Sequence, residues 1–208
     1  MLTHAVVLAR HGFGVLLVDA RGHGRSAGRA MDFGWYGDRD IAAAVTFLQS
    51  RPDVDRRRIA VVGMSMGGEE AIGAAASDPR IRAVVAEGAT GRVAADKAFL
   101  PEVYGLNGWL QQCIDRVTTA YTALLTDARP PVSLRNAVAA TAPRPVLLVT
   151  GGNVADEGHA ARHMQRGNSN VQVWTAPGAG HTAGLATRPD DWERRVTGFL
   201  GDALTGPA

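Results

Sequence analysis

The sequence has almost no cysteine and no apolar run of membrane-spanning length. Its 208 residues include one cysteine, Cys113, which cannot form a disulfide within the chain and has no metal or reactive-thiol motif around it. No stretch approaches the roughly 18 apolar residues that cross a bilayer, and no charged segment followed by an apolar signal core opens the chain. We therefore expect a cytoplasmic protein without a membrane segment and a structural role for the thiol.

The sequence also lacks an excess of charge of one sign. Lys and Arg total 22 against 20 Asp and Glu, and the basic residues are scattered in short groups such as Arg56-Arg57-Arg58. This pattern indicates surface solvation and predicts no nucleic-acid partner. His159 and His163 stand at i, i+4 in a predicted helix, a spacing that can hold a metal but is more typical of a solvated face. We expect neither a metal nor a cofactor.

What is present is the composition of one globular domain, residues 1–208, with 46% hydrophobic and 20% charged residues. Short runs rich in Val and Ile recur with helical patterns between most of them, and parallel strands need such crossover connections. The sequence therefore predicts an α/β fold with a mostly parallel sheet and helices on both faces. The expected strands cover residues 15–18, 59–62, 81–86, 146–149 and 171–174.

Residues 91–142 break this alternation. Helical patterns at 108–125 and 136–140 are separated by Pro130-Pro131. We interpret the segment as a small helical insertion, similar to a cap, within the domain.

The strongest motif is Gly63-Met64-Ser65-Met66-Gly67, which follows one predicted strand and opens a helix. In that context G-x-S-x-G forms a nucleophile elbow, where small neighbours let a strained turn present the serine hydroxyl. We expect Ser65 to be a nucleophile and the Met66 backbone N–H to donate to an oxyanion. The competing interpretation is a glycine-rich turn with an incidental serine.

A serine hydroxyl needs a base, and the base needs a carboxylate to orient it. His181 follows the last predicted strand and the loop Pro177-Gly178-Ala179-Gly180, so we expect it to be the base. For the acid we favour Asp156, in the loop after the strand at 146–149. Glu157 is the next candidate, although helix-start electrostatics would explain it without catalysis. Glu87, at the end of an earlier strand, ranks third.

A dinucleotide-binding module is the rival class. Gly22-His23-Gly24-Arg25-Ser26-Ala27 follows a predicted strand and formally matches the dinucleotide fingerprint. Later glycines would interrupt the helix that should begin there, and no strand ends in an acidic residue at the required distance. A loop at a pocket rim explains the same residues.

The chain resembles the α/β-hydrolase superfamily in four segments, namely residues 15–26, 59–68 and 145–156 and the loop that ends at His181. Within the superfamily it is most similar to the dienelactone-hydrolase and prolyl-oligopeptidase-like branches. The resemblance covers essentially the whole chain. It implies a serine hydrolase with the triad Ser65, Asp156 and His181, acting on a small-molecule ester or, as a second choice, a peptide.

The chain departs from that family at its beginning. Relatives carry further strands before the helix predicted at residues 2–10, and a His-Gly loop there supplies a second oxyanion donor. Without that segment we expect an open sheet between the strands at 15–18 and 59–62. Two expectations follow: either the true start lies upstream of Met1, or the chain is a hydrolase fragment with impaired activity.

Overall fold

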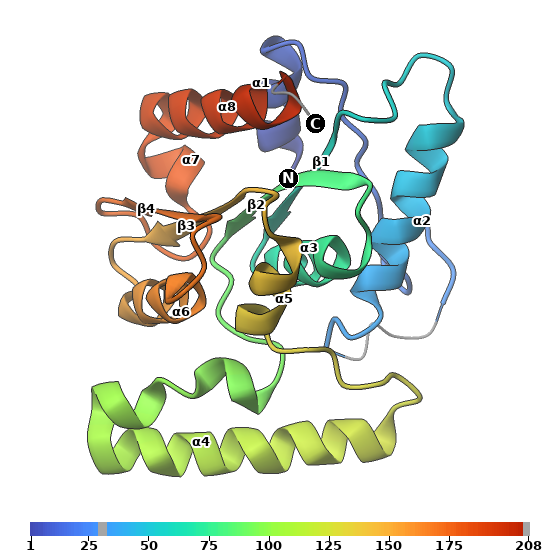
Figure 1. The fold of residues 1–208 in the computed structure, drawn as a ribbon. Coiled ribbons are helices and arrows are strands. Elements are labelled where there is room, and N and C mark those ends of the chain that lie inside the picture. The colour runs from blue at the N-terminus through green and yellow to red at the C-terminus, as the bar shows by residue number, and fades with distance from the viewer. Residues whose placement is uncertain (29–32, 206–208) are drawn as a thin grey trace.

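Four parallel strands form the centre of the computed structural model, which describes residues 1–28 and 33–205 (Figure 1). They are β1 (Ile59–Met64), β2 (Ile81–Glu87), β3 (Val146–Gly151) and β4 (Val171–Ala176), and they lie side by side in chain order. Val62 pairs with Val85, and Val85 pairs with Leu147. All of β3 is buried, as expected for a strand covered on both faces. The predicted α/β fold class is confirmed.

Helices cover both faces of this sheet. On one face lie α2 (Gly37–Ser50), α3 (Met66–Ser77), α5 (Leu134–Thr141) and α6 (Ala155–Gln165). On the other lie α1 (Leu2–Arg10), the short α7 (Gly184–Thr187) and α8 (Pro189–Thr205), as Figure 1 shows. Each layer has its own apolar core. The first includes Ile72 and Leu148, and the second includes Val85 and the fully buried Trp192.

The strand predicted at residues 15–18 is wrong. These residues belong to neither a helix nor a strand, and Leu16, Leu17 and Val18 are exposed. A strand needs neighbouring backbone groups to pair with, and β1 is hydrogen-bonded only to β2 among the described strands. High β-propensity alone therefore does not make this segment part of the sheet.

The segment between β2 and β3 contains a short 3₁₀ helix, η1 (Ala94–Lys97), the long α4 (Leu100–Leu125) and α5. Within it, Leu134, Ala137 and Val138 of α5 belong to the core beside α3. By contrast, α4 lies outside the helix layer and is the outermost element on that side of Figure 1. It bends at Gly105, whose φ of 57° lies in the left-handed region that glycine favours.

Within residues 1–28 and 33–205, no helix is both long and apolar enough to cross a membrane.

Candidate active site

Ser65 stands on a strained turn between β1 and α3. Its φ of 53° and ψ of −125° are unusual for a residue with a side chain. Its backbone N–H donates to Glu87 O at 2.7 Å, which ties the turn to the end of β2. Met66 is the first residue of α3, where a helix leaves N–H groups unpaired and its dipole is positive. The turn therefore holds the Ser65 hydroxyl beside a potential anion-binding site.

The glycines around Ser65 differ in importance. A Cβ on Gly63 would lie 2.1 Å from Gly67 O, and one on Gly68 would lie 3.1 Å from both Ala86 Cβ and Gly63 O. A Cβ on Gly67 would meet nothing within 4 Å. The strand and helix can approach each other because Gly63 and Gly68 lack side chains, whereas Gly67 is not required sterically.

Ser65, His181 and Glu157 form one chain of hydrogen bonds. His181 Nε2 lies 2.9 Å from Ser65 Oγ, and His181 Nδ1 lies 2.6 Å from Glu157 Oε1. The other carboxylate oxygen of Glu157 accepts from the Gly151 N–H at 2.7 Å. The Glu157 side chain is fully buried, whereas the His181 side chain is about half exposed. Ser65 is therefore partly exposed at one end of this chain of bonds, whereas burial and the Gly151 N–H hold Glu157 in place at the other end.

Asp156, the carboxylate that we favoured from the sequence, does not contact His181. It lies in the first turn of α6 beside Glu157 and accepts a hydrogen bond of 2.5 Å from the Tyr104 hydroxyl. This bond raises the pKa of Tyr104. Helix α6 begins at Ala155, earlier than we expected, so both acids are helical and point in different directions. The contact expected of Asp156 is made by Glu157.

Glu87 is also turned away from His181. Its two oxygens accept from the Gly184 N–H at 2.7 Å and from Trp192 Nε1 at 2.9 Å. The carboxylate is buried and joins the end of β2 to α7 and α8. In this geometry Glu87 bonds α7 and α8 to the sheet and makes no contact that would orient His181.

The loop that carries His181 is bonded to the loop after β3. Asn153 donates from its backbone to Ala179 O at 3.0 Å and from Nδ2 to Gly178 O at 2.9 Å. A Cβ on Gly151 would lie 2.5 Å from Gly180 O, and one on Gly88 would lie 2.9 Å from the His181 ring. In the sequence, Gly151-Gly152-Asn153 is only the start of the loop after the strand predicted at 146–149. Its use as a docking surface for the histidine loop had no local signal, although Gly and Asn are common where loops approach closely.

Acidic side chains of α2 and α3 lie close to a buried arginine from the loop after β2. The Arg92 side chain is fully buried, with Nη1 2.9 Å from Asp38 Oδ1 and Nη2 donating to Gly34 O. Burial raises the pKa of Glu70 to about 7, even though Arg92 opposes the shift. Burial likewise raises the pKa of Asp38 and Glu69. Glu70 and Glu69 lie in α3, so this cluster supports the helix that begins at the elbow.

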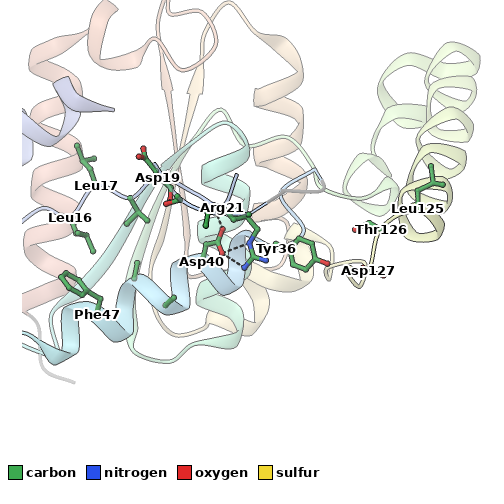
Figure 2. A pocket seen from close by; sticks show the side chains of 16 residues that line it. Leu16, Leu17, Asp19, Arg21, Tyr36, Asp40, Phe47, Leu125, Thr126 and Asp127 are labelled. Atoms are coloured by element: carbon green, nitrogen blue, oxygen red, sulfur yellow. Dashed lines mark hydrogen bonds and ion pairs between the residues drawn. The ribbon is translucent and has the colours of Figure 1, made fainter. Parts of the chain in front are cut away.

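A groove of about 960 Å³ lies elsewhere, between residues 16–28, α2 and the end of α4 (Figure 2). Asp40 lines it and receives bonds from Arg21 Nε at 2.9 Å and Nη2 at 2.6 Å. Burial alone would raise the pKa of Asp40, but these bonds outweigh it and hold the pKa below its usual value. The groove is lined by neither Ser65 nor His181, so the hydrogen-bonded triad, and not this hollow, marks the candidate site.

The dinucleotide interpretation of residues 22–27 lacks its structural context. His23 N bonds Ala20 O and Ser26 N bonds His23 O, so the segment is a series of turns. The next helix, α2, begins only at Gly37. The helix that should bind a pyrophosphate is absent at that point of the described chain.

His159 and His163 pack against aromatic rings. Their ring centroids lie 6.2 Å and 5.8 Å from that of Phe99. Burial lowers the pKa of His163. Among the residues described, no group of three His, Cys, Asp or Glu side chains is placed to hold a metal ion.

Sequence comparisons match the chain to one family of hydrolases and to several named relatives. The model of the family described as "Serine aminopeptidase, S33" matches residues 2–177. A 90-residue segment is 39% identical to the thiohydrolase apmlB of Arthrinium phaeospermum, covering 41% of this chain and 29% of that protein. An 83-residue segment is 39% identical to the thiohydrolase aneE of Aspergillus aculeatus, covering 39% of this chain and 26% of that protein. The matched segments thus span less than a third of either relative.

Solved structures agree in fold. The esterase Pf2001 of Pyrococcus furiosus superposes with a TM-score of 0.72 and 25% identity, over 98% of this chain and 76% of its own. The α/β hydrolase GrgF of Penicillium sp. sh18 has a TM-score of 0.69 at 18% identity, over 99% and 85% of the two chains. The superfamily predicted from the elbow motif is therefore confirmed. With its family model matched over residues 2–177, the chain belongs to the serine aminopeptidase S33 family of α/β hydrolases.

Proposed function

We propose that this chain is a serine hydrolase that cleaves carboxylic esters, including thioesters, through an acyl-enzyme on Ser65. The observation that carries the proposal is the continuous hydrogen-bond chain from Ser65 Oγ through His181 to the buried Glu157, with distances of 2.9 Å and 2.6 Å. A nucleophile, a base within reach of its proton and an orienting carboxylate are the parts that acyl transfer requires.

Proton positions follow from the chemistry of the three groups. An ionised Glu157 can only accept, so it holds the His181 proton on Nδ1 and leaves Nε2 to take the Ser65 proton. When Ser65 Oγ attacks an acyl carbonyl, the proton moves to Nε2, and the resulting imidazolium is stabilised by Glu157. The same proton then passes to the leaving alkoxide or thiolate. Water repeats both transfers and releases the acid.

The negative oxygen of the tetrahedral intermediate would be stabilised by the Met66 N–H at the start of α3. Loss of one oxyanion donor typically costs about 100- to 1,000-fold in rate, so the number of donors decides the turnover. A chain with Met66 as its only donor would be slow in both acylation and deacylation, because each step forms such an oxyanion. That behaviour is the alternative function, a hydrolase of impaired activity.

Thioesters and oxygen esters share the acyl half of the reaction and differ in the leaving group. Relatives named as thiohydrolases and a structural neighbour named as an esterase support both classes. The description of the matching family adds an aminopeptidase as a second candidate. An amide is harder to cleave than an ester, because its nitrogen must be protonated by His181 before it can leave.

The test is labelling with a fluorophosphonate together with hydrolysis of p-nitrophenyl acetate, acetylthiocholine and alanine p-nitroanilide. We expect label on Ser65, none on Ser65→Ala, and turnover of the ester and the thioester. Turnover of the anilide alone would favour the aminopeptidase. Equal labelling of the parent and Ser65→Ala would contradict the assignment of the nucleophile.

A further inference from the structure

The first turn of α4 packs Leu100 and Val103 against the core, but beyond the bend at Gly105 the helix is amphipathic in the reverse of the usual sense. There, the side that faces the domain is small or polar and includes Gly108, Gln112 and Asp115. Asp115 lies 3.7 Å from Lys97 Nζ, and Thr119 Oγ1 accepts from the Ala94 N–H at 3.0 Å, so these contacts hold the polar side against η1. A surface helix normally buries its apolar side. Here the apolar side faces outward.

The outward side is a continuous apolar stripe. It consists of Leu106, Leu110, Ile114, Val117, Tyr121 and Leu125, whose exposed fractions range from 48% to 81%. Leu124, at 78%, widens it at one end. The positions recur every three or four residues over about 30 Å of helix, so they share one face. Contiguous exposed apolar surface of this kind typically marks a binding site.

The spacing of this stripe reads the same in both directions. From Leu106 to Leu125 the intervals are four, four, three, four and four residues, with the centre between Asp115 and Arg116. An antiparallel copy of the helix would place Leu106 opposite Leu125, Leu110 opposite Tyr121 and Ile114 opposite Val117. A two-fold interface requires this self-complementarity, because each residue must meet its partner twice.

Charge also favours a protein surface over a lipid surface. Interfacial helices carry many Lys and Arg residues on their polar side. Between residues 103 and 125 the charged side chains are Asp115 and Arg116, and Asp115 faces the domain. The stripe itself has no charge that would repel an identical copy.

We propose that α4 is a dimerisation helix, which pairs antiparallel with α4 of a second copy of this chain through the stripe from Leu106 to Leu125. The pairing leaves Ser65, His181 and Glu157 outside the contact, so each protomer keeps its own candidate site. The proposal does not depend on the hydrolase function.

Sedimentation velocity of the whole chain at about 1 to 50 µM tests the pairing. We expect a dimer for the parent chain. Leu110→Glu and Tyr121→Lys should each raise the dimer dissociation constant by at least about 100-fold, because each dimer would bury two unpaired charges. Ala120→Glu is the matched control for Leu110→Glu, since it adds the same charge at an exposed position of the same helix outside the stripe and should leave the dimer intact.

Mixing the two variants tests the direction of pairing. In an antiparallel dimer of one Leu110→Glu chain and one Tyr121→Lys chain, the two new charges face each other and the second contact keeps Leu opposite Tyr. The mixture should therefore dimerise although neither variant does alone. Far-UV circular dichroism and urea unfolding of each variant verify that it is folded.

A cysteine pair gives a second measurement that needs no disruptive charge. In a Cys113→Ser background, a chain with Ile114→Cys and a chain with Val117→Cys should form a mixed disulfide on oxidation, faster than either forms a disulfide with itself. A monomeric parent, a dimer that persists in Leu110→Glu, or a monomer that binds phosphatidylcholine vesicles through α4 would overturn the proposal.

Discussion

Glu157 and Asp156 are adjacent in the first turn of α6, yet only Glu157 contacts His181, at 2.6 Å, while Asp156 accepts from Tyr104. Successive residues of a helix point about 100° apart, so one carboxylate faces the sheet edge and the other faces α4. The two residues share charge and helix turn but differ in burial, since Glu157 is fully buried and Asp156 is exposed. Asp156 therefore controls for loss of a charge in this turn, and thermal unfolding controls for the difference in burial.

The first prediction uses this pair. Glu157→Gln should lower kcat for p-nitrophenyl acetate by at least about 1,000-fold, since the amide can no longer fix the histidine tautomer or balance its charge. Asp156→Asn should change kcat less than about 3-fold. Steady-state kinetics on both variants, with thermal unfolding as a check on folding, give the answer. A larger loss for Asp156→Asn would return the acid to our sequence-based choice.

The elbow and the sheet could be predicted from the sequence because both are local patterns. The motif that contains Gly63 and Ser65 predicts a strained turn, and apolar runs such as residues 146–149 predict buried strands. Which carboxylate contacts His181 could not be predicted, because the choice between Asp156 and Glu157 depends on where α6 begins, and element boundaries are the part of a fold that local sequence patterns fix least. Asn153 bonding to the histidine loop is a long-range contact with no local signal.

Apolar periodicity indicates which face of a helix is apolar, and it does not indicate what covers that face. In α1 the helix is present, but Val7 and Leu8 are buried while Val6 is exposed. In α4 the apolar stripe faces away from the domain. Residues 15–18 have a strand composition but no ladder partner among the described residues.

The second prediction separates the glycines of the elbow. Gly63→Ala should destabilise the fold by about 3 kcal/mol or more, because its Cβ would lie 2.1 Å from backbone Gly67 O. Gly67→Ala meets nothing within 4 Å and replaces a poor helix former, so it should be neutral or stabilise by up to about 1 kcal/mol. Urea unfolding measures both changes. Similar stabilities for the two variants would mean that the turn relaxes easily.

The third prediction concerns Glu87, our third candidate for the acid. Glu87→Gln should lower the free energy of unfolding by about 1 to 3 kcal/mol, because one of its two donors, Gly184 N–H or Trp192 Nε1, would then face an amide NH₂. Its kcat at a temperature where the variant is folded should stay within about 3-fold of the parent. A selective fall in kcat with unchanged stability would assign Glu87 to the reaction.

The last prediction follows from the buried Glu70. Its carboxyl has a pKa of about 7 in the folded chain, chiefly because it is buried, and near its ordinary value of 4.5 when unfolded. Between these values the folded chain holds a proton that the unfolded chain has lost, so the free energy of unfolding falls as pH rises from about 4.5 through 7. Glu70→Gln resembles the protonated acid and should remove this component. The free energy of unfolding of the variant should match that of the parent at pH 5 and exceed it by about 1 to 3 kcal/mol at pH 8, with Arg92 reducing the difference.

Asp38 and Glu69 also have raised pKa values, so part of the pH dependence of the free energy of unfolding should remain in the variant. Urea unfolding at pH 5, 6, 7 and 8 gives both slopes, and Glu102→Gln, at an exposed carboxylate, is the control. If the difference between Glu70→Gln and the parent is the same at pH 5 and pH 8, Glu70 is not the group that titrates, and Arg92 must hold it ionised throughout.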